Sequence, residues 1–193
     1  MSTSPQYIRT DKAIMQALMH LMREKPFEKI TVQDILDETP VTRATFYAHY
    51  HDKYEIIERM LSHFFTLRAS LQEQFASPLS SRDRELNQRL LLEHRELAET
   101  LLQVRTEKVD FRRAIATDLE QTYLANSASP TRQIEARIYA QAVTEMNIAI
   151  ISDKSIKLSE ETVARILLPV ALKLLNLDGD PETKMLLERK LNL

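Results

Sequence analysis

The chain has 193 residues, 44% hydrophobic and 28% charged, with a formal net charge of −2, which is typical of a globular protein with its own core and excludes a wholly disordered chain. Its single glycine, Gly179, excludes the glycine-rich loops with which nucleotide-binding proteins hold phosphate. The absence of cysteine excludes disulfides and cysteine-zinc sites, and it suits the reducing cytoplasm in which we expect this protein.

The first predicted helix follows a short N-terminal arm. Residues 1–9 are expected to be frayed. Thr10 is the predicted N-cap, and apolar residues then recur at helical spacing. Because Pro26 disfavours the helical conformation of the residue before it, this helix is expected to end near Glu24.

Two short helices separated by a tight turn are predicted next. Thr31 and Asp34 have the spacing of a capping box, with Asp in place of the usual Glu or Gln. The helix that they start is expected to end near Thr39-Pro40. Thr42 is the predicted N-cap of the following helix, which covers residues 43–50.

The remainder of the chain is also helical in pattern. A fourth helix is predicted from Lys53 to before Ser77, and later helices are predicted over residues 84–103, 110–126, 132–151 and 160–177. No segment has a convincing strand pattern. We therefore expect an all-α protein, with short helices in an N-terminal domain over residues 1–52 and longer helices in a second domain over residues 53–193.

Catalytic, metal and membrane sites lack their sequence signals. None of the five histidines belongs to an HExxH pair or follows a Glu at the spacing of a di-metal helix bundle. The N-terminus has no signal-peptide pattern, and no apolar run reaches the roughly 18 residues of a membrane span. We therefore expect a non-enzymatic protein without catalytic residues, metal, cofactor or membrane partner.

The two short helices have the plan of a helix-turn-helix unit, whose second helix enters the major groove of DNA. On a helical wheel, Phe46 and Tyr50 share one side, which we expect to face inward, and Ala44 and Ala48 fall opposite. Small outward side chains allow a close approach to base edges. Residues 1–55 carry seven Lys or Arg and eight Asp or Glu, so a DNA site must be a local patch. The alternative is a helical hairpin that never touches DNA.

The run Thr45-Phe46-Tyr47-Ala48-His49-Tyr50-His51-Asp52-Lys53 resembles the DNA-binding domain of the tetracycline-repressor (TetR) family, and the resemblance extends over roughly residues 10–60. It implies an N-terminal three-helix domain that binds double-stranded DNA. The bases would be read by Gln33, Arg43 and Ala44. The remaining implied DNA-binding residues, which would contact phosphates or the groove, are Thr31, Thr42, Thr45, Tyr47, His49 and Lys53.

Two positions within this resemblance, His49 and the turn at Thr39-Pro40, differ from the others. For His49, packing against neighbouring helices is an equal alternative to a phosphate contact. The family usually has Ala-Gly in the turn, where this chain has Thr39-Pro40. Because proline cannot adopt the positive φ that glycine allows, this turn is expected to close differently.

The predicted helix over residues 160–177 is apolar on more than one face, which indicates a partner. The resemblance implies a homodimer in which this helix and the helix over 132–151 form a four-helix bundle with their mates. The alternative is that the helix over 160–177 is buried on both sides within one subunit. In either case Pro169 is expected to kink this helix. The candidate interface residues are Ile138, Val143, Ile150, Val163, Leu167, Val170 and Leu174.

The resemblance also implies a pocket for a small-molecule inducer between the later helices. Its candidate lining residues, which are also candidates for ordinary core, are Met60, Phe64, Phe111, Tyr123, Tyr139 and Met146. The function that we expect is a homodimeric, ligand-responsive repressor that binds a palindromic operator. The alternative is a DNA-bound scaffold that recruits another protein and senses no small molecule, for which an exposed apolar patch would be typical.

Overall fold

The computed structural model describes residues 4–72, 89–124, 129–156 and 162. Within these residues the regular elements are helices, and β structure is limited to an isolated antiparallel bridge between Arg105 and Asp110. The prediction of an all-α fold is confirmed. The contacts divide the chain into two compact units: the first unit is Met1–Leu67 with Glu96–Phe111, and the second unit is Arg68–Arg95 with Arg112–Leu193.

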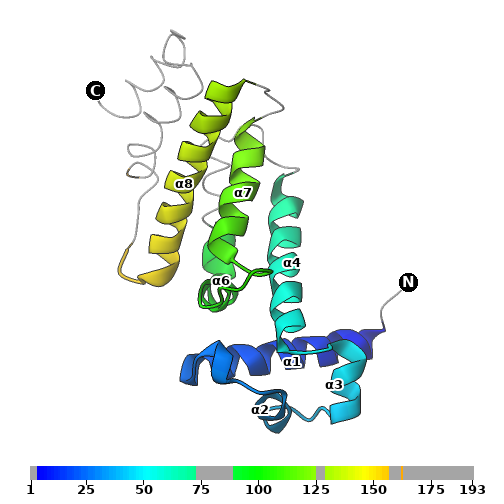
Figure 1. Ribbon diagram of the computed structural model, residues 1–193. Helices are drawn as coiled ribbons and strands as arrows, with labels where there is room; N and C mark the ends of the chain where they lie inside the picture. Colours follow the sequence, from blue (N-terminus) through cyan, green and yellow to red (C-terminus); the bar gives the residue numbers. More distant parts are fainter. Residues whose placement is uncertain (1–3, 73–88, 125–128, 157–161, 163–193) are drawn as a thin grey trace. The chain divides into compact units, whose positions relative to one another are not determined.

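The first unit holds the short N-terminal helices together with most of α4 (Figure 1). Its elements are α1 (Pro5–Glu24), the 3-10 helix η1 (Phe27–Lys29), α2 (Val32–Asp37), α3 (Arg43–His49), α4 (Lys53–Gln72) up to Leu67, and α6 (Arg95–Leu102) from Glu96 onward. Each contributes apolar side chains to the interior, and among the buried ones are Ile14, Leu18, Phe27, Ile35, Phe46, Ile56, Met60 and Ala98. An ion pair between Arg23 and Glu96 connects α1 to α6.

Helix α1 begins at Pro5, so the prediction of a frayed arm over residues 1–9 was wrong for residues 5–9. Ser4 is the N-cap, because its hydroxyl accepts the backbone N–H of Tyr7 at 3.2 Å. The first turn of a helix makes no use of its backbone N–H groups within the helix, so proline is favourable there. Ser4-Pro5 is therefore a local signal for a helix start, although the apolar residues begin to recur only later. The predicted end at Glu24 is confirmed, since Lys25 is extended.

Helices α2 and α3 begin directly after Thr31 and Thr42, the N-caps predicted from the sequence. Both hydrogen bonds of the Thr31–Asp34 capping box are present, and the Thr42 hydroxyl accepts the backbone N–H of Thr45 at 3.2 Å. Helix α2 ends at Asp37, three residues before Pro40. The turn closes on α2 itself, because the Thr39 hydroxyl donates to the Ile35 carbonyl at 3.2 Å.

The second unit contains α7 (Phe111–Leu124) from Arg112 onward and α8 (Pro130–Ser152), which run antiparallel (Figure 1). Arg112 pairs with Glu145, and Glu120 pairs with Arg137 at 3.2 Å, so advancing along α7 means returning along α8. The helix predicted over 132–151 starts two residues earlier, at Pro130, with Ser129 as its N-cap.

The prediction of one continuous helix over residues 84–103 was wrong at His94. The structure has helix at residues 89–93 and again in α6, with a turn at His94 between them. Neither glycine nor proline occurs in this stretch, so the sequence carried no local signal for the break. The predicted end of the fourth helix near Ser77 and nearly all of the helix predicted over 160–177 lie outside the described residues.

Candidate nucleic-acid interface

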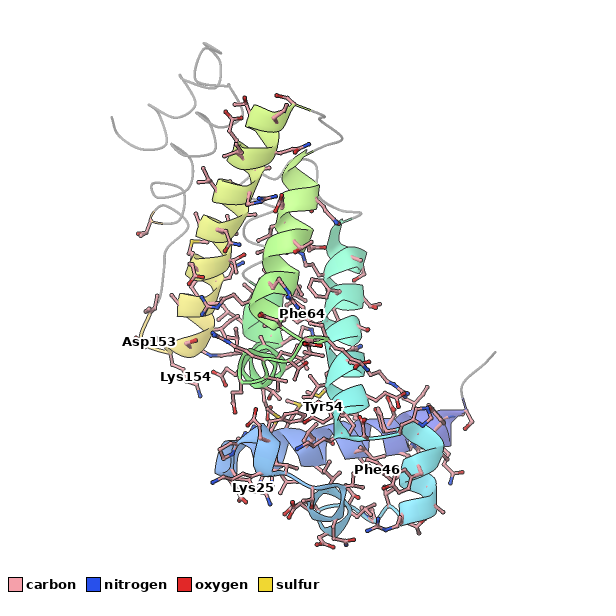
Figure 2. All side chains as sticks on the ribbon, viewed as in Figure 1. Lys25, Phe46, Tyr54, Phe64, Asp153 and Lys154 are labelled. Atoms are coloured by element: carbon pink, nitrogen blue, oxygen red, sulfur yellow. The ribbon has the colours of Figure 1, made fainter. Side chains whose placement is uncertain are left out.

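Helix α3 presents small and polar side chains outward and aromatic ones inward. Arg43, Ala44, Tyr47 and Ala48 are exposed. Phe46, which Figure 2 labels on α3, is fully buried. The predicted division of the helix into two faces is confirmed. The Phe46 and Tyr47 rings meet edge to face with centroids 5.4 Å apart, and Tyr47 keeps 47% of its surface exposed. The outer face therefore combines two small alanine side chains with side chains that can form hydrogen bonds.

The threonine hydroxyls at the two caps are already engaged locally. The Thr31 hydroxyl and backbone N–H both donate to the Asp34 carboxylate at 2.7 Å. The Thr42 and Thr45 hydroxyls bond to each other at 2.9 Å. A hydroxyl has one proton to donate, and a phosphate oxygen only accepts. Of the three hydroxyls, one of the Thr42–Thr45 pair is therefore left with a proton for a phosphate in this structure.

The two predicted base-reading polar residues are joined across the turn. Arg43 Nη2 donates to Gln33 Oε1 at 2.5 Å, and Gln33 Nε2 donates to Asp37 Oδ1 at 2.7 Å. All three residues are exposed. Ala44 follows Arg43 on the same outer face. The structure therefore brings Gln33, Arg43 and Ala44 together at the start of α3.

His49 lies in the interior of the first unit. It is 8% exposed, its ring stacks on the Tyr7 ring with centroids 3.9 Å apart, and its Nδ1 lies 3.7 Å from Asp11 Oδ1. This placement favours the packing alternative over the phosphate contact. Contact of His49 with DNA stays a prediction.

Lys53 fastens the start of α4 to the segment around η1. Its ammonium donates to the carbonyl oxygens of Phe27 at 2.8 Å, Glu28 at 3.0 Å and Ile30 at 2.7 Å. An ammonium has three N–H donors, so these contacts use all of them. Burial lowers the pKa of Lys53 from its ordinary value. The predicted phosphate contact is not tested by these geometries, which show a structural role that the sequence did not reveal.

A polar cluster beneath α3, made by Asp11, Tyr50 and Arg59, was missed by sequence reasoning. The Tyr50 hydroxyl donates to Asp11 at 2.6 Å, and Arg59 Nη1 donates to the same carboxylate oxygen at 2.9 Å. Arg59 Nη2 donates to the His49 carbonyl at 2.9 Å, at the end of α3. Burial and the bond to Asp11 raise the pKa of Tyr50 well above its usual range. The available signal was that a buried tyrosine hydroxyl requires a partner.

The candidate pocket residues divide between the two units. Met60, Phe64 and Phe111 are buried in the first unit, where Phe64 and Phe111 meet edge to face with centroids 4.8 Å apart. Tyr139 is buried and Met146 is half-buried on α8, in the second unit. The side chain of Tyr123 lies outside the described residues.

The candidate dimer residues that the structure describes point in two directions on α8. Ile138 is 53% exposed, and Ile134, one turn earlier, is 60% exposed. Val143 and Ile150 are buried instead. Val163, Leu167, Val170 and Leu174 lie outside the described residues. Ile138 is therefore the one predicted interface residue of this helix that is available for a partner.

The part of the chain that the structure describes contains no group of three or more His, Asp or Glu residues that could hold a metal ion. None of its helices is long and apolar enough to cross a membrane.

A capped pair of short helices with an exposed second helix defines a helix-turn-helix domain. Residues 14–60 match the model of the family described as bacterial regulatory proteins, tetR family. Residues 14–60 are therefore similar to the tetR family, in agreement with the resemblance seen in the sequence.

Two curated relatives from Bacillus subtilis are similar to the same part of the chain. The uncharacterized HTH-type transcriptional regulator YxbF is 36% identical over 55 residues, which is 28% of this chain and 14% of that protein. The uncharacterized HTH-type transcriptional regulator YvkB is 31% identical over 65 residues, 34% of each chain. The chain thus covers about a third or less of the length of these relatives, and the similarity concerns the helix-turn-helix domain.

Proposed function

We propose that this chain is a cytoplasmic transcriptional regulator that binds double-stranded DNA through α3. The observation that carries the proposal is the outer face of α3, where Ala44 and Ala48 are exposed together with Arg43 and Tyr47. Small side chains let the helix approach base edges, and Arg43 can donate two hydrogen bonds to guanine. The tetR-family match over residues 14–60 supports this use of the helix.

The same proposal includes a homodimer on a palindromic operator. The exposed Ile134 and Ile138 lie one turn apart on α8, and an apolar stripe of this kind is typical of a surface that a partner covers. Two copies would place two recognition helices about one DNA turn apart, roughly 34–36 Å. A different protein on the same stripe is the second candidate, which corresponds to a DNA-bound recruiting scaffold.

We assign the dimer the role of a ligand-responsive repressor, with an inducer held among the later helices. The buried aromatic side chains of Phe64 and Phe111, which pack against each other in the first unit, are of the kind that line apolar ligand sites. Native mass spectrometry of the purified chain tests this part. A small molecule retained by the folded protein and lost on unfolding supports the ligand-responsive form. A chain that carries no small molecule supports the scaffold if it also represses transcription from its operator equally with and without added cell extract.

The DNA-binding part is tested by selection from random duplex DNA. The chain is bound to a pool with a randomised central region, and the retained duplexes are sequenced after several rounds. We expect an enriched palindrome whose half-sites are separated by about 10 base pairs, centre to centre. A retained pool with the composition of the starting pool contradicts the proposal.

A further inference from the structure

The exposed contacts between α2 and α3 form a relay of fixed polarity. The Asp37 carboxylate only accepts hydrogen bonds, and the Arg43 guanidinium only donates them. The Gln33 amide lies between them, with its nitrogen toward Asp37 at 2.7 Å and its oxygen toward Arg43 at 2.5 Å. The order of these three side chains therefore determines which end of the amide faces Arg43.

Two electrostatic effects disfavour a carboxylate at position 37. Asp37 is the last residue of α2, where the negative end of the helix dipole disfavours a carboxylate. It also lies beside residues that approach DNA phosphates in the proposed complex, which repel a negative charge. Within the part of the chain that the structure describes, the hydrogen bond from Gln33 is the contact that favours it.

The relay leaves Arg43 able to read a base. A guanidinium has five N–H donors, and Gln33 occupies one of them. The remaining donors are sufficient for the two parallel bonds to guanine O6 and N7. Because a long arginine side chain otherwise samples many rotamers, the bond to Gln33 limits how the guanidinium plane is turned.

We propose that Asp37 is a positioning residue for base recognition, which orients Gln33 and through it Arg43 without itself touching DNA. The inference rests on the proposed DNA-binding function and adds a specificity determinant on α2 to it. The base pair that Arg43 reads then depends on a carboxylate outside the recognition helix. Removal of the Asp37 carboxylate should therefore lower base discrimination and raise the affinity for DNA of any sequence.

The test compares three carboxylate variants on the selected operator, its single-base variants and random DNA. Asp37→Ala removes the acceptor, Asp37→Asn keeps an acceptor oxygen without the charge, and Glu38→Ala removes a neighbouring exposed carboxylate that the relay does not use. Arg43→Ala identifies the base pair in question, where we expect discrimination to fall by roughly 5- to 150-fold.

We expect Asp37→Ala to lower discrimination at that base pair by about threefold or more, while its affinity for random DNA rises as much as that of Glu38→Ala. Asp37→Asn should retain discrimination, and Asp37→Ala should add nothing to Arg43→Ala in the double variant. If Asp37→Ala shifts affinity for all sequences equally, as Glu38→Ala does, the positioning role is wrong. If Arg43→Ala leaves base preference unchanged, the relay is overturned while DNA binding stands. If the wild type selects no sequence, the proposed function fails with it.

Discussion

At the residue scale, Asp34 holds the start of α2 through three contacts. It accepts the backbone N–H and hydroxyl of Thr31 at 2.7 Å and pairs with Lys25 at 2.8 Å. The hydrogen bond from Lys25, followed by those from Thr31, holds the pKa of Asp34 well below its usual range. The contacts in the folded chain therefore favour the ionised carboxylate.

The pH dependence of stability tests this arrangement. A carboxyl group whose pKa is lower in the folded state stabilises the fold above its unfolded pKa, about 4, and this contribution disappears as pH falls through the folded value. Asp34→Asn should therefore unfold at lower urea concentration than wild type near neutral pH, and the two curves should converge in strong acid. A difference that stays constant with pH contradicts this role of Asp34.

Lys53 gives a second prediction at this scale. Lys53→Met keeps an aliphatic chain but leaves three carbonyl oxygens without their ammonium partner. We expect a loss of about 1–3 kcal/mol in the free energy of unfolding, measured by urea denaturation. Unchanged stability, together with a salt dependence of DNA binding that becomes shallower by about one per subunit, would instead support the phosphate contact predicted from sequence.

At the scale of elements, α3 is fixed at both ends by different means. Its start is fixed by a local contact, because the Thr42 side chain accepts the backbone N–H of Thr45, three residues further along the chain. Its end depends on distant residues, because Arg59 of α4 binds the His49 carbonyl and Tyr50 binds Asp11 of α1. The orientation of the outer face of α3 therefore depends on the polar cluster beneath it.

Tyr50→Phe tests the contribution of that cluster. The change removes the hydroxyl that donates to Asp11 at 2.6 Å and keeps the buried ring. We expect a loss of about 1–2 kcal/mol in the free energy of unfolding by thermal or urea denaturation. Tyr54→Phe is the control, because Tyr54 is 42% exposed and its hydroxyl can bond to water. Equal effects of the two changes would contradict a special role for the Asp11 contact.

The sequence predicted features of this domain that depend on neighbours along the chain. The Thr31 and Thr42 caps and the inward Phe46 follow from spacings within one helical turn, and the structure has them. The packing of His49 against Tyr7 and the bonds of Lys53 join residues more than twenty positions apart, so no local pattern contains them. The break at His94 had no local signal either.

At the scale of the whole molecule, the units defined by contacts and the domains predicted from sequence have different boundaries. The first unit continues along α4 to Leu67. Lys53 and Arg59 attach the start of α4 to earlier segments, and Phe64 further along the helix packs against Phe111. A functional boundary at residue 52 stays a prediction, since packing does not report which residues act together on DNA or ligand.

The oligomeric state is tested by light scattering at micromolar concentration. We expect twice the chain mass of 22.4 kDa for wild type and a shift toward 22.4 kDa for Ile138→Asp, which puts a charge on the exposed apolar stripe. Gln133→Asp is the control, since Gln133 is exposed on α8 but lies about 140° around the helix from Ile138. A wild-type mass of one chain would exclude the proposed homodimer.

The most direct test of the central claim, that DNA is bound by the outer face of α3, is the DNA affinity of Ala44→Glu. Ala44 is exposed in the first turn of α3, where an acidic residue favours the helix, so folding should be preserved. Gln103→Glu places the same charge at an exposed position of the first unit after α6 and is the matched control. We predict that Ala44→Glu weakens operator binding by more than about 100-fold, because its carboxylate meets the negative groove, while Gln103→Glu binds like wild type. Wild-type affinity of a folded Ala44→Glu variant would contradict the account.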